Sequence, residues 1–190
     1  MILNGIVVQG NRAWQNMCFE EYRGIMRFEA WPTWSESEFK DLNSYINYLY
    51  IGYYPEVISE LGFAKKYVRE CLKNNIKIRI LAIESDSERP IWKAKKPEMH
   101  YLGYECASPI GDYFSHTGDD FNLCNLTDYP EYEKYKEKLN GYGLFDDIET
   151  LKDCMEVRER LFKKGELEYL CDYTEYIRVS EIEIMHLLAL

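Results

Sequence analysis

The hydrophobic residues of this chain recur with two different periods, and the alternation between them limits the folds that it can adopt. Between residues 62 and 74 the apolar side chains recur at helical spacing, which is typical of a helix with one buried face. Residues 76–84 change to a period of two, with Ile78 and Ile80 separated by Arg79, which is typical of a strand. A chain that contains segments of both kinds is predicted to pack helices against a sheet.

The same patterns predict the other elements. Strands are expected over residues 2–9, 18–30, 99–106 and 173–184, and further helices after Ser35, from Asp128 to Asn140 and from Asp147 to Lys164. A change of apolar parity in the last strand predicts a bulge near Ser180. This order favours an α+β fold with a mixed, mostly antiparallel sheet and helices packed against it. The length of 190 residues suits one domain over residues 1–190.

Two of the helices have a predicted buried face. In the helix from Gly62, the side chains expected to be buried are Phe63, Tyr67, Val68, Cys71 and Leu72. In the helix from Asp147, they are Ile148, Leu151, Met155 and Leu161, and Gly165 is expected to end it.

The sequence lacks the patterns of an exported or membrane protein. Its first residues contain no basic leader, and their apolar run is too short for a signal sequence or a membrane span. The six cysteines are scattered without a C-x-x-C pair. We therefore expect a cytoplasmic protein with reduced thiols and no membrane partner.

The acidic charge is concentrated in the second half of the chain. Residues 1–95 carry 13 basic and 12 acidic side chains, whereas residues 96–190 carry 10 basic and 21 acidic ones. From Pro97 to Glu133 there are eight carboxylates and no lysine or arginine. Such a field repels nucleic-acid phosphates and attracts basic partners, although acidic runs also serve simply as solvated surface. We expect a basic protein partner and no nucleic acid.

Aromatic side chains are interleaved with these carboxylates. Carboxylates bind lysine and arginine, while tyrosine and phenylalanine supply contact area. Aromatic residues on a loop or at the start of a helix are expected at the surface. The predicted partner-binding residues are Glu105, Asp112, Tyr113, Asp119, Asp120, Asp128 and Tyr129.

Part of this region also has the composition of a metal or hydrolytic site. Asp112, His116 and Asp119 offer oxygen and imidazole ligands. However, no second ligand cluster has recognisable spacing, and loops rich in Asp, Gly and Ser commonly form turns. A thiol nucleophile at Cys106 or Cys124 is conceivable, but buried inert thiols are far more frequent. We predict no catalytic residue, no metal and no cofactor, and keep a small metal-binding or hydrolytic domain as an alternative.

Two segments of the second half match the pattern of a known family. They are Leu102-Gly103-Tyr104-Glu105-Cys106-Ala107-Ser108, before a polar aromatic loop, and Leu139-Asn140-Gly141-Tyr142-Gly143-Leu144-Phe145-Asp146-Asp147, before an acidic helix. From Tyr101 to about residue 164 the chain thereby resembles bacterial immunity proteins of polymorphic-toxin systems. The resemblance covers less than half of the chain and contains no catalytic motif. It implies a cytosolic inhibitor that binds and blocks a cognate toxin domain, often a basic nuclease.

Charge and resemblance together predict a non-enzymatic acidic inhibitor that neutralises a cognate basic toxin. A phage-type DNA-mimic inhibitor of a host nuclease uses the same physics on a different partner and stays open as an alternative. A housekeeping interaction domain with a solvated acidic face is a further alternative.

Overall fold

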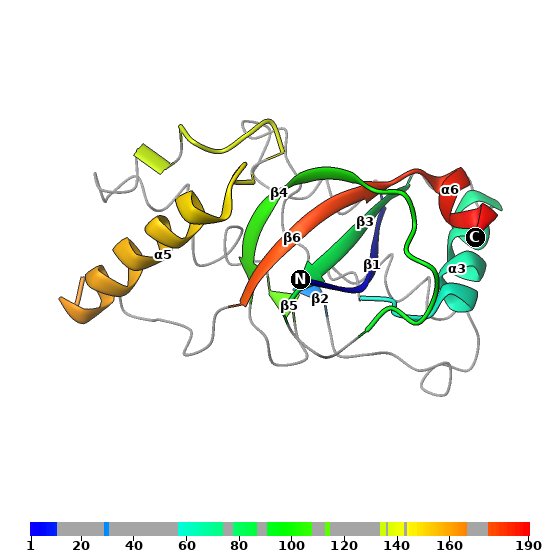
Figure 1. Ribbon diagram of the computed structural model, residues 1–190, viewed down its shortest axis with the longest axis horizontal. Coiled ribbons are helices and arrows are strands. Elements are labelled where there is room, and N and C mark those ends of the chain that lie inside the picture. Colours follow the sequence, from blue (N-terminus) through cyan, green and yellow to red (C-terminus); the bar gives the residue numbers. More distant parts are fainter. Residues whose placement is uncertain are drawn as a thin grey trace.

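The computed structural model describes ten ranges of the chain, and the structural statements below refer to them. They are residues 1–10, 29–30, 57–73, 78–86, 91–107, 113–114, 134–135, 137–142, 144–166 and 175–190. In chain order the elements are β1 (Ile2–Gly10), β2 (Glu29–Ala30), α3 (Leu61–Lys73), β3 (Ile78–Ser85), β4 (His100–Ala107), β5 (Tyr113–Phe114), α5 (Ile148–Lys163), β6 (Glu175–Ile182) and α6 (Ile184–Ala189) (Figure 1).

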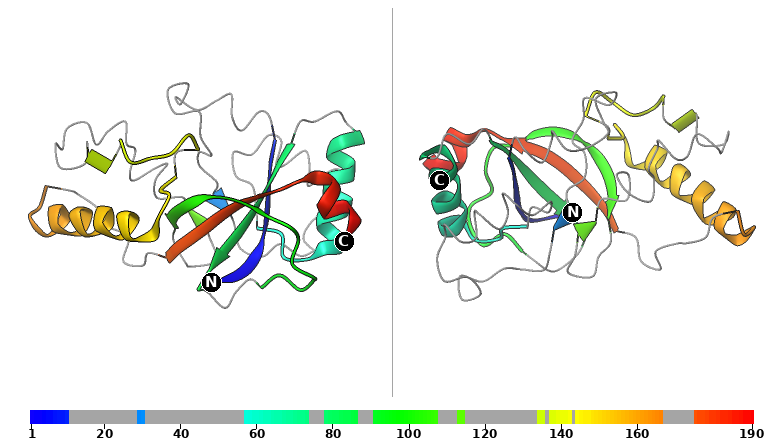
Figure 2. Two further views of the ribbon diagram at one scale, coloured as in Figure 1. Left: turned by 45° about the horizontal axis from the view of Figure 1, so that its top comes forward. Right: turned by 180° about the vertical axis from the view of Figure 1, so that it is seen from behind.

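Four strands form the main sheet, in the order β1-β3-β6-β4, and each neighbouring pair is antiparallel. The strands β2 and β5 form a separate two-stranded antiparallel sheet. Helices pack against the main sheet, with α3 and α6 at one end and α5 at the other (Figures 1 and 2). The predicted α+β fold is confirmed, and all strand pairs among the described residues are antiparallel rather than mixed.

Both faces of the main sheet are buried along its central strands. Ile80 and Ala82 of β3 point into a cluster shared with α3 and α6, whereas Leu81 and Ile83 belong to a second cluster. Burial is therefore continuous from Ile80 to the end of β3. The predicted period of two is therefore not seen in the burial of these side chains. A strand that is covered on both faces needs apolar residues at consecutive positions.

The bulge predicted in β6 near Ser180 is wrong. β6 pairs with β3 without a shift of register, and the irregularity lies in the neighbouring strand β4, between Tyr101 and Gly103. Val179 and Ile182 belong to different core clusters. The change of apolar parity marks two buried faces and needs no extra residue in β6.

The first predicted amphipathic helix is present as α3. Phe63, Tyr67, Val68 and Cys71 are buried, as expected. Leu72 is 40% exposed, so its predicted burial is wrong. It lies at the edge of the apolar face, which the neighbouring elements leave uncovered.

The helix predicted from Asp147 to Lys164 is present as α5, and local sequence determines both of its ends. Asp147 is the N-cap, and its carboxylate accepts a hydrogen bond of 2.8 Å from the backbone N–H of Thr150. Gly165 has φ 74°, its N–H donates to the carbonyl of Phe162, and the next N–H donates to the carbonyl of Leu161. This pair of bonds is a Schellman motif, which satisfies carbonyls that the last turn leaves unpaired.

The buried face of α5 is mostly as predicted. Leu151, Met155 and Leu161 are buried, while Ile148 is only half-buried. Leu151, Met155 and Leu161 pack with Cys106 of β4 in a third core cluster.

Short segments cover both edge strands of the main sheet. On β1, Ile6 and Ile58 exchange backbone hydrogen bonds of 2.9 and 2.7 Å. On β4, Tyr104 and Phe145 do the same at 2.7 and 3.0 Å. These pairings occupy backbone groups that an edge strand otherwise presents to other chains.

Some predicted elements lie outside the described residues. Of the strand over 18–30 only Glu29–Ala30 is described, and the helix after Ser35 falls wholly outside. The helix predicted to run to Asn140 ends earlier, because Leu139 forms a β-bridge with Phe145.

Candidate functional site

The structure describes two of the seven predicted partner-binding residues. Tyr113 begins β5, where its backbone pairs with Ala30. Asp112, Asp119, Asp120, Asp128 and Tyr129 lie outside the described residues, as does His116 of the alternative metal site.

Glu105 is not at the surface, which corrects its assignment to partner binding. It sits opposite Ile177 of β6 and is fully buried. Burial raises the pKa of the neighbouring Cys106 thiol, and the Glu105 carboxylate raises it further. The sequence signal that suggested exposure was charge, but β4 is covered on both faces at this position.

The described cysteines are buried thiols. Burial raises the pKa of Cys106 well above its usual value, and its Sγ lies 3.3 Å from the Sδ of Met155. Burial likewise raises the pKa of Cys71 to about 11 and that of Cys154 to about 12. Since the thiolate is the nucleophile, a catalytic thiol at Cys106 is contradicted. Cys124, the other candidate, lies outside the described residues.

The second segment of the family pattern forms a tight turn against β4. The amide of Asn140 donates 2.7 Å to the carbonyl of Leu102 and 2.8 Å to the carboxylate of Asp146. Its side-chain carbonyl oxygen accepts hydrogen bonds from the backbone N–H groups of Tyr142 and Leu144, at 2.9 and 3.3 Å. Asn140 therefore joins the turn to β4 at the point where the strand is irregular.

A hollow of about 390 Å³ lies between β4, β6 and the start of α5. Tyr101 and Tyr104 meet edge to face there, with ring centroids 5.6 Å apart, and the Arg178 guanidinium is 5.1 Å from the Tyr101 ring. The Tyr101 hydroxyl donates 2.6 Å to the carbonyl of Asp146, and burial raises its pKa to about 12. The Tyr101 hydroxyl is therefore protonated, and its hydrogen bond is made within the fold.

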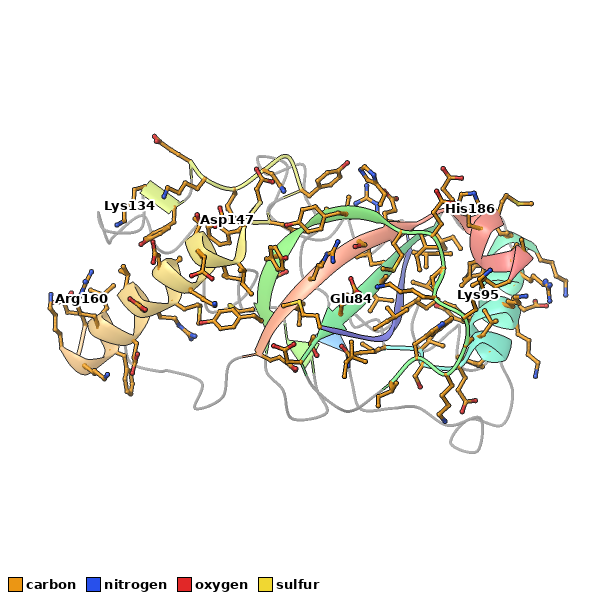
Figure 3. The ribbon with its side chains drawn as sticks, viewed as in Figure 1. Glu84, Lys95, Lys134, Asp147, Arg160 and His186 are labelled. Atoms are coloured by element: carbon orange, nitrogen blue, oxygen red, sulfur yellow. The ribbon has the colours of Figure 1, made fainter. Side chains whose placement is uncertain are left out.

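One buried carboxylate links two cations beside this hollow. Glu84 is 2% exposed and lies near the middle of the main sheet (Figure 3). Its Oε1 is 2.5 Å from Nζ of Lys96, and its Oε2 is 3.7 Å from Nε of Arg178. This cluster ties the segment before β4 to the face of β6.

A second concavity, which we name the α6 groove, has a volume of about 450 Å³. It lies where β3 and β4 begin and β6 passes into α6 (Figure 1). Its lining includes Ile78, His100, Glu181, Glu183 and Met185. Sequence reasoning missed it, because these residues come from separate segments and no local pattern connects them.

Within the described ranges, no group of three His, Cys, Asp or Glu side chains is arranged to hold a metal ion. Among the helices described, none combines the length and the apolar character that crossing a membrane requires. No protein-family model, curated protein or solved structure matches this chain.

Proposed function

We propose that this chain is a non-enzymatic acidic inhibitor that binds and neutralises a cognate basic toxin in the cytoplasm, as an immunity protein does. The observation that carries the proposal is the acidic segment from Pro97 to Glu133, which has no lysine or arginine and, besides the buried Glu105, seven further carboxylates. Opposite charge speeds association and aligns the partners. A toxin that cleaves nucleic acid needs a positive surface to hold phosphates, and an acidic segment of this kind is suited to cover that surface.

The described residues on either side of the acidic segment belong to the folded body. Within the segment, β4 belongs to the main sheet and β5 pairs with β2. Just beyond it, Tyr135 is buried in the third core cluster. Attachment at fixed points lowers the conformational entropy that a binding segment loses on association.

The residues that carry the family resemblance have roles in the fold. Asn140 joins its turn to β4, and Asp147 caps α5. Both residues follow the acidic segment in the chain, and Asn140 fixes its turn against β4. A folded scaffold of this kind supports a segment that is presented to one partner.

A growth assay tests the proposal. The gene adjacent to that of this chain is expressed in a heterologous bacterium, alone and together with this chain. We expect growth arrest in the first case and rescue in the second. Changing Asp112, Asp119 and Asp120 together to lysine should abolish rescue and weaken calorimetric binding about a hundredfold, because desolvated carboxylates would be replaced by like charges.

The matched control changes three exposed carboxylates outside the segment, Glu137, Asp153 and Glu156, to lysine. The net charge changes by the same amount, so this variant should keep rescue. Equal loss in both variants would reduce the effect to overall charge. Unchanged binding in the first variant would show that the acidic segment is not part of the interface.

The partner separates the proposal from the DNA-mimic alternative. If the chain inhibits a host nuclease and not the adjacent gene product, the alternative is correct. Metal analysis of the purified chain, with and without an Asp112→Asn and His116→Ala double substitution, tests the metal-binding alternative.

A further inference from the structure

The short helix α6 displays an apolar side chain that the core does not use. Met185 is 70% exposed, the highest value among the large hydrophobic residues that the structure describes as exposed. Leu187, two residues on, is fully buried and anchors the helix to the core. A flexible, polarizable methionine suits a surface that takes up apolar groups from a partner.

The α6 groove beside Met185 has an apolar lining. Ile78 and Ile184 line it and are partly buried against the core cluster that includes α3. The groove is lined where the starts of β3 and β4 lie beside α6. An aliphatic side chain placed there would cover Met185 and lose its own contact with water.

The rim of the groove is acidic. Among the described residues that line the groove, Arg79 is the only lysine or arginine, and its Nε lies 3.3 Å from the carboxylate of Glu181. Glu183, which lines the groove, is 77% exposed and lies 3.7 Å from the imidazole of His186. Glu98 does not line the groove, but it is 83% exposed and lies 3.9 Å from the same imidazole. Figure 3 places His186 on α6, above the sheet end. Glu98 is also the first carboxylate of the acidic segment from Pro97 to Glu133.

From this geometry we propose that the α6 groove binds a short segment of the basic partner, in which an aliphatic side chain is flanked by lysine or arginine. The inference rests on the proposed function and adds a second contact to it. An apolar centre within a charged rim is the usual anatomy of a protein interface. A second copy of this chain fits poorly, because each copy carries a net charge of −10 and would bring an acidic rim against the first.

Methyl NMR of the full chain tests the groove without the toxin. The six methionines are labelled at their ε-methyl carbons, and a Met185→Leu variant identifies the Met185 signal. The probe is the acetylated peptide amide Lys-Leu-Arg, and the control probe is Glu-Leu-Glu. We expect the Met185 signal to shift with the basic peptide at millimolar concentration and to stay in place with the acidic one.

Charge reversal at the rim provides the matched comparison. Glu183→Lys should raise the peptide concentration at half-saturation about fivefold, which corresponds to a surface ion pair. The side chain of Glu183 makes no capping hydrogen bond, so the helix loses none. Asp153→Lys makes the same charge change on α5, at another exposed position, and should leave binding unchanged.

Three results would overturn the inference. They are no shift of Met185, an equal shift with the acidic peptide, and a shift that depends on protein concentration without peptide, which would identify a second copy as the occupant. The two proposals fail separately. If the Glu183→Lys variant still rescues growth and binds the toxin with unchanged affinity, the groove is not part of the toxin interface. The proposed inhibitor function is then unaffected.

Discussion

Gly103 of β4 and Leu144 of the following turn lie so close together that no side chain fits between them. A Cβ on Gly103 would lie 2.5 Å from the Cβ of Leu144 and 2.9 Å from the carbonyl oxygen of Phe145. This approach allows Phe145 to pair with Tyr104 and to cover the edge of β4. Backbone packing thus accounts for the glycine at position 103.

Gly103→Ala is expected to destabilise the fold. The added methyl group must displace Leu144 or the Phe145 backbone, which costs about 1–3 kcal/mol of unfolding free energy in overpacked sites. Denaturant unfolding measures the change. Gly62→Ala is the control, because nothing lies within 4 Å of a Cβ there, and within α3 the alanine should stabilise the fold by up to about 1 kcal/mol. Equal effects at both positions would contradict the close contact.

The cluster around Glu84 should respond unequally to the loss of its two kinds of partner. Among the described cations, Lys96→Met leaves the 2% exposed carboxylate with the more distant Arg178, whereas Glu84→Gln leaves cations whose side chains are 55% and 40% exposed. Cations that reach water need no buried partner. We expect the lysine change to cost about 2 kcal/mol and the glutamate change about 1 kcal/mol in unfolding free energy. The reverse order would show that Glu84 is hydrated in solution.

Asp147 should contribute stability that depends on pH. Hydrogen bonds from Thr150 to its carboxylate lower its pKa below the usual 3.8. A lowered pKa in the folded state stabilises the protein above the unfolded-state pKa, and this contribution is lost as pH falls through the folded-state value. The melting temperature of Asp147→Ala should therefore lie below that of the wild type at neutral pH, and the difference should shrink below about pH 4. A difference that stays constant to acid pH would exclude the charged cap.

The buried thiols should be inert in the native state. Because burial raises the pKa values of Cys71, Cys106 and Cys154, we expect iodoacetamide at pH 8 to modify them only after unfolding. Peptide mass spectrometry resolves each position. If Cys106 were modified faster than the protein unfolds, its thiol would have to reach solvent in the folded protein.

Much of the local structure follows from the sequence alone. The start of α5 at Asp147, its stop at Gly165 and the buried face of α3 depend on residues within a few positions of one another, so nearby sequence suffices to predict them. The asymmetry of charge is also a property of the sequence. It motivates a basic partner whatever the fold.

Only the tertiary structure decided which charged and apolar residues reach the surface. Glu105 is buried and Leu72 is exposed, against expectation, because the covering elements come from distant parts of the chain. The same is true of the α6 groove, whose lining joins the starts of two strands to the C-terminal helix. Burial and concavity depend on long-range packing, and neither period nor composition contains that information.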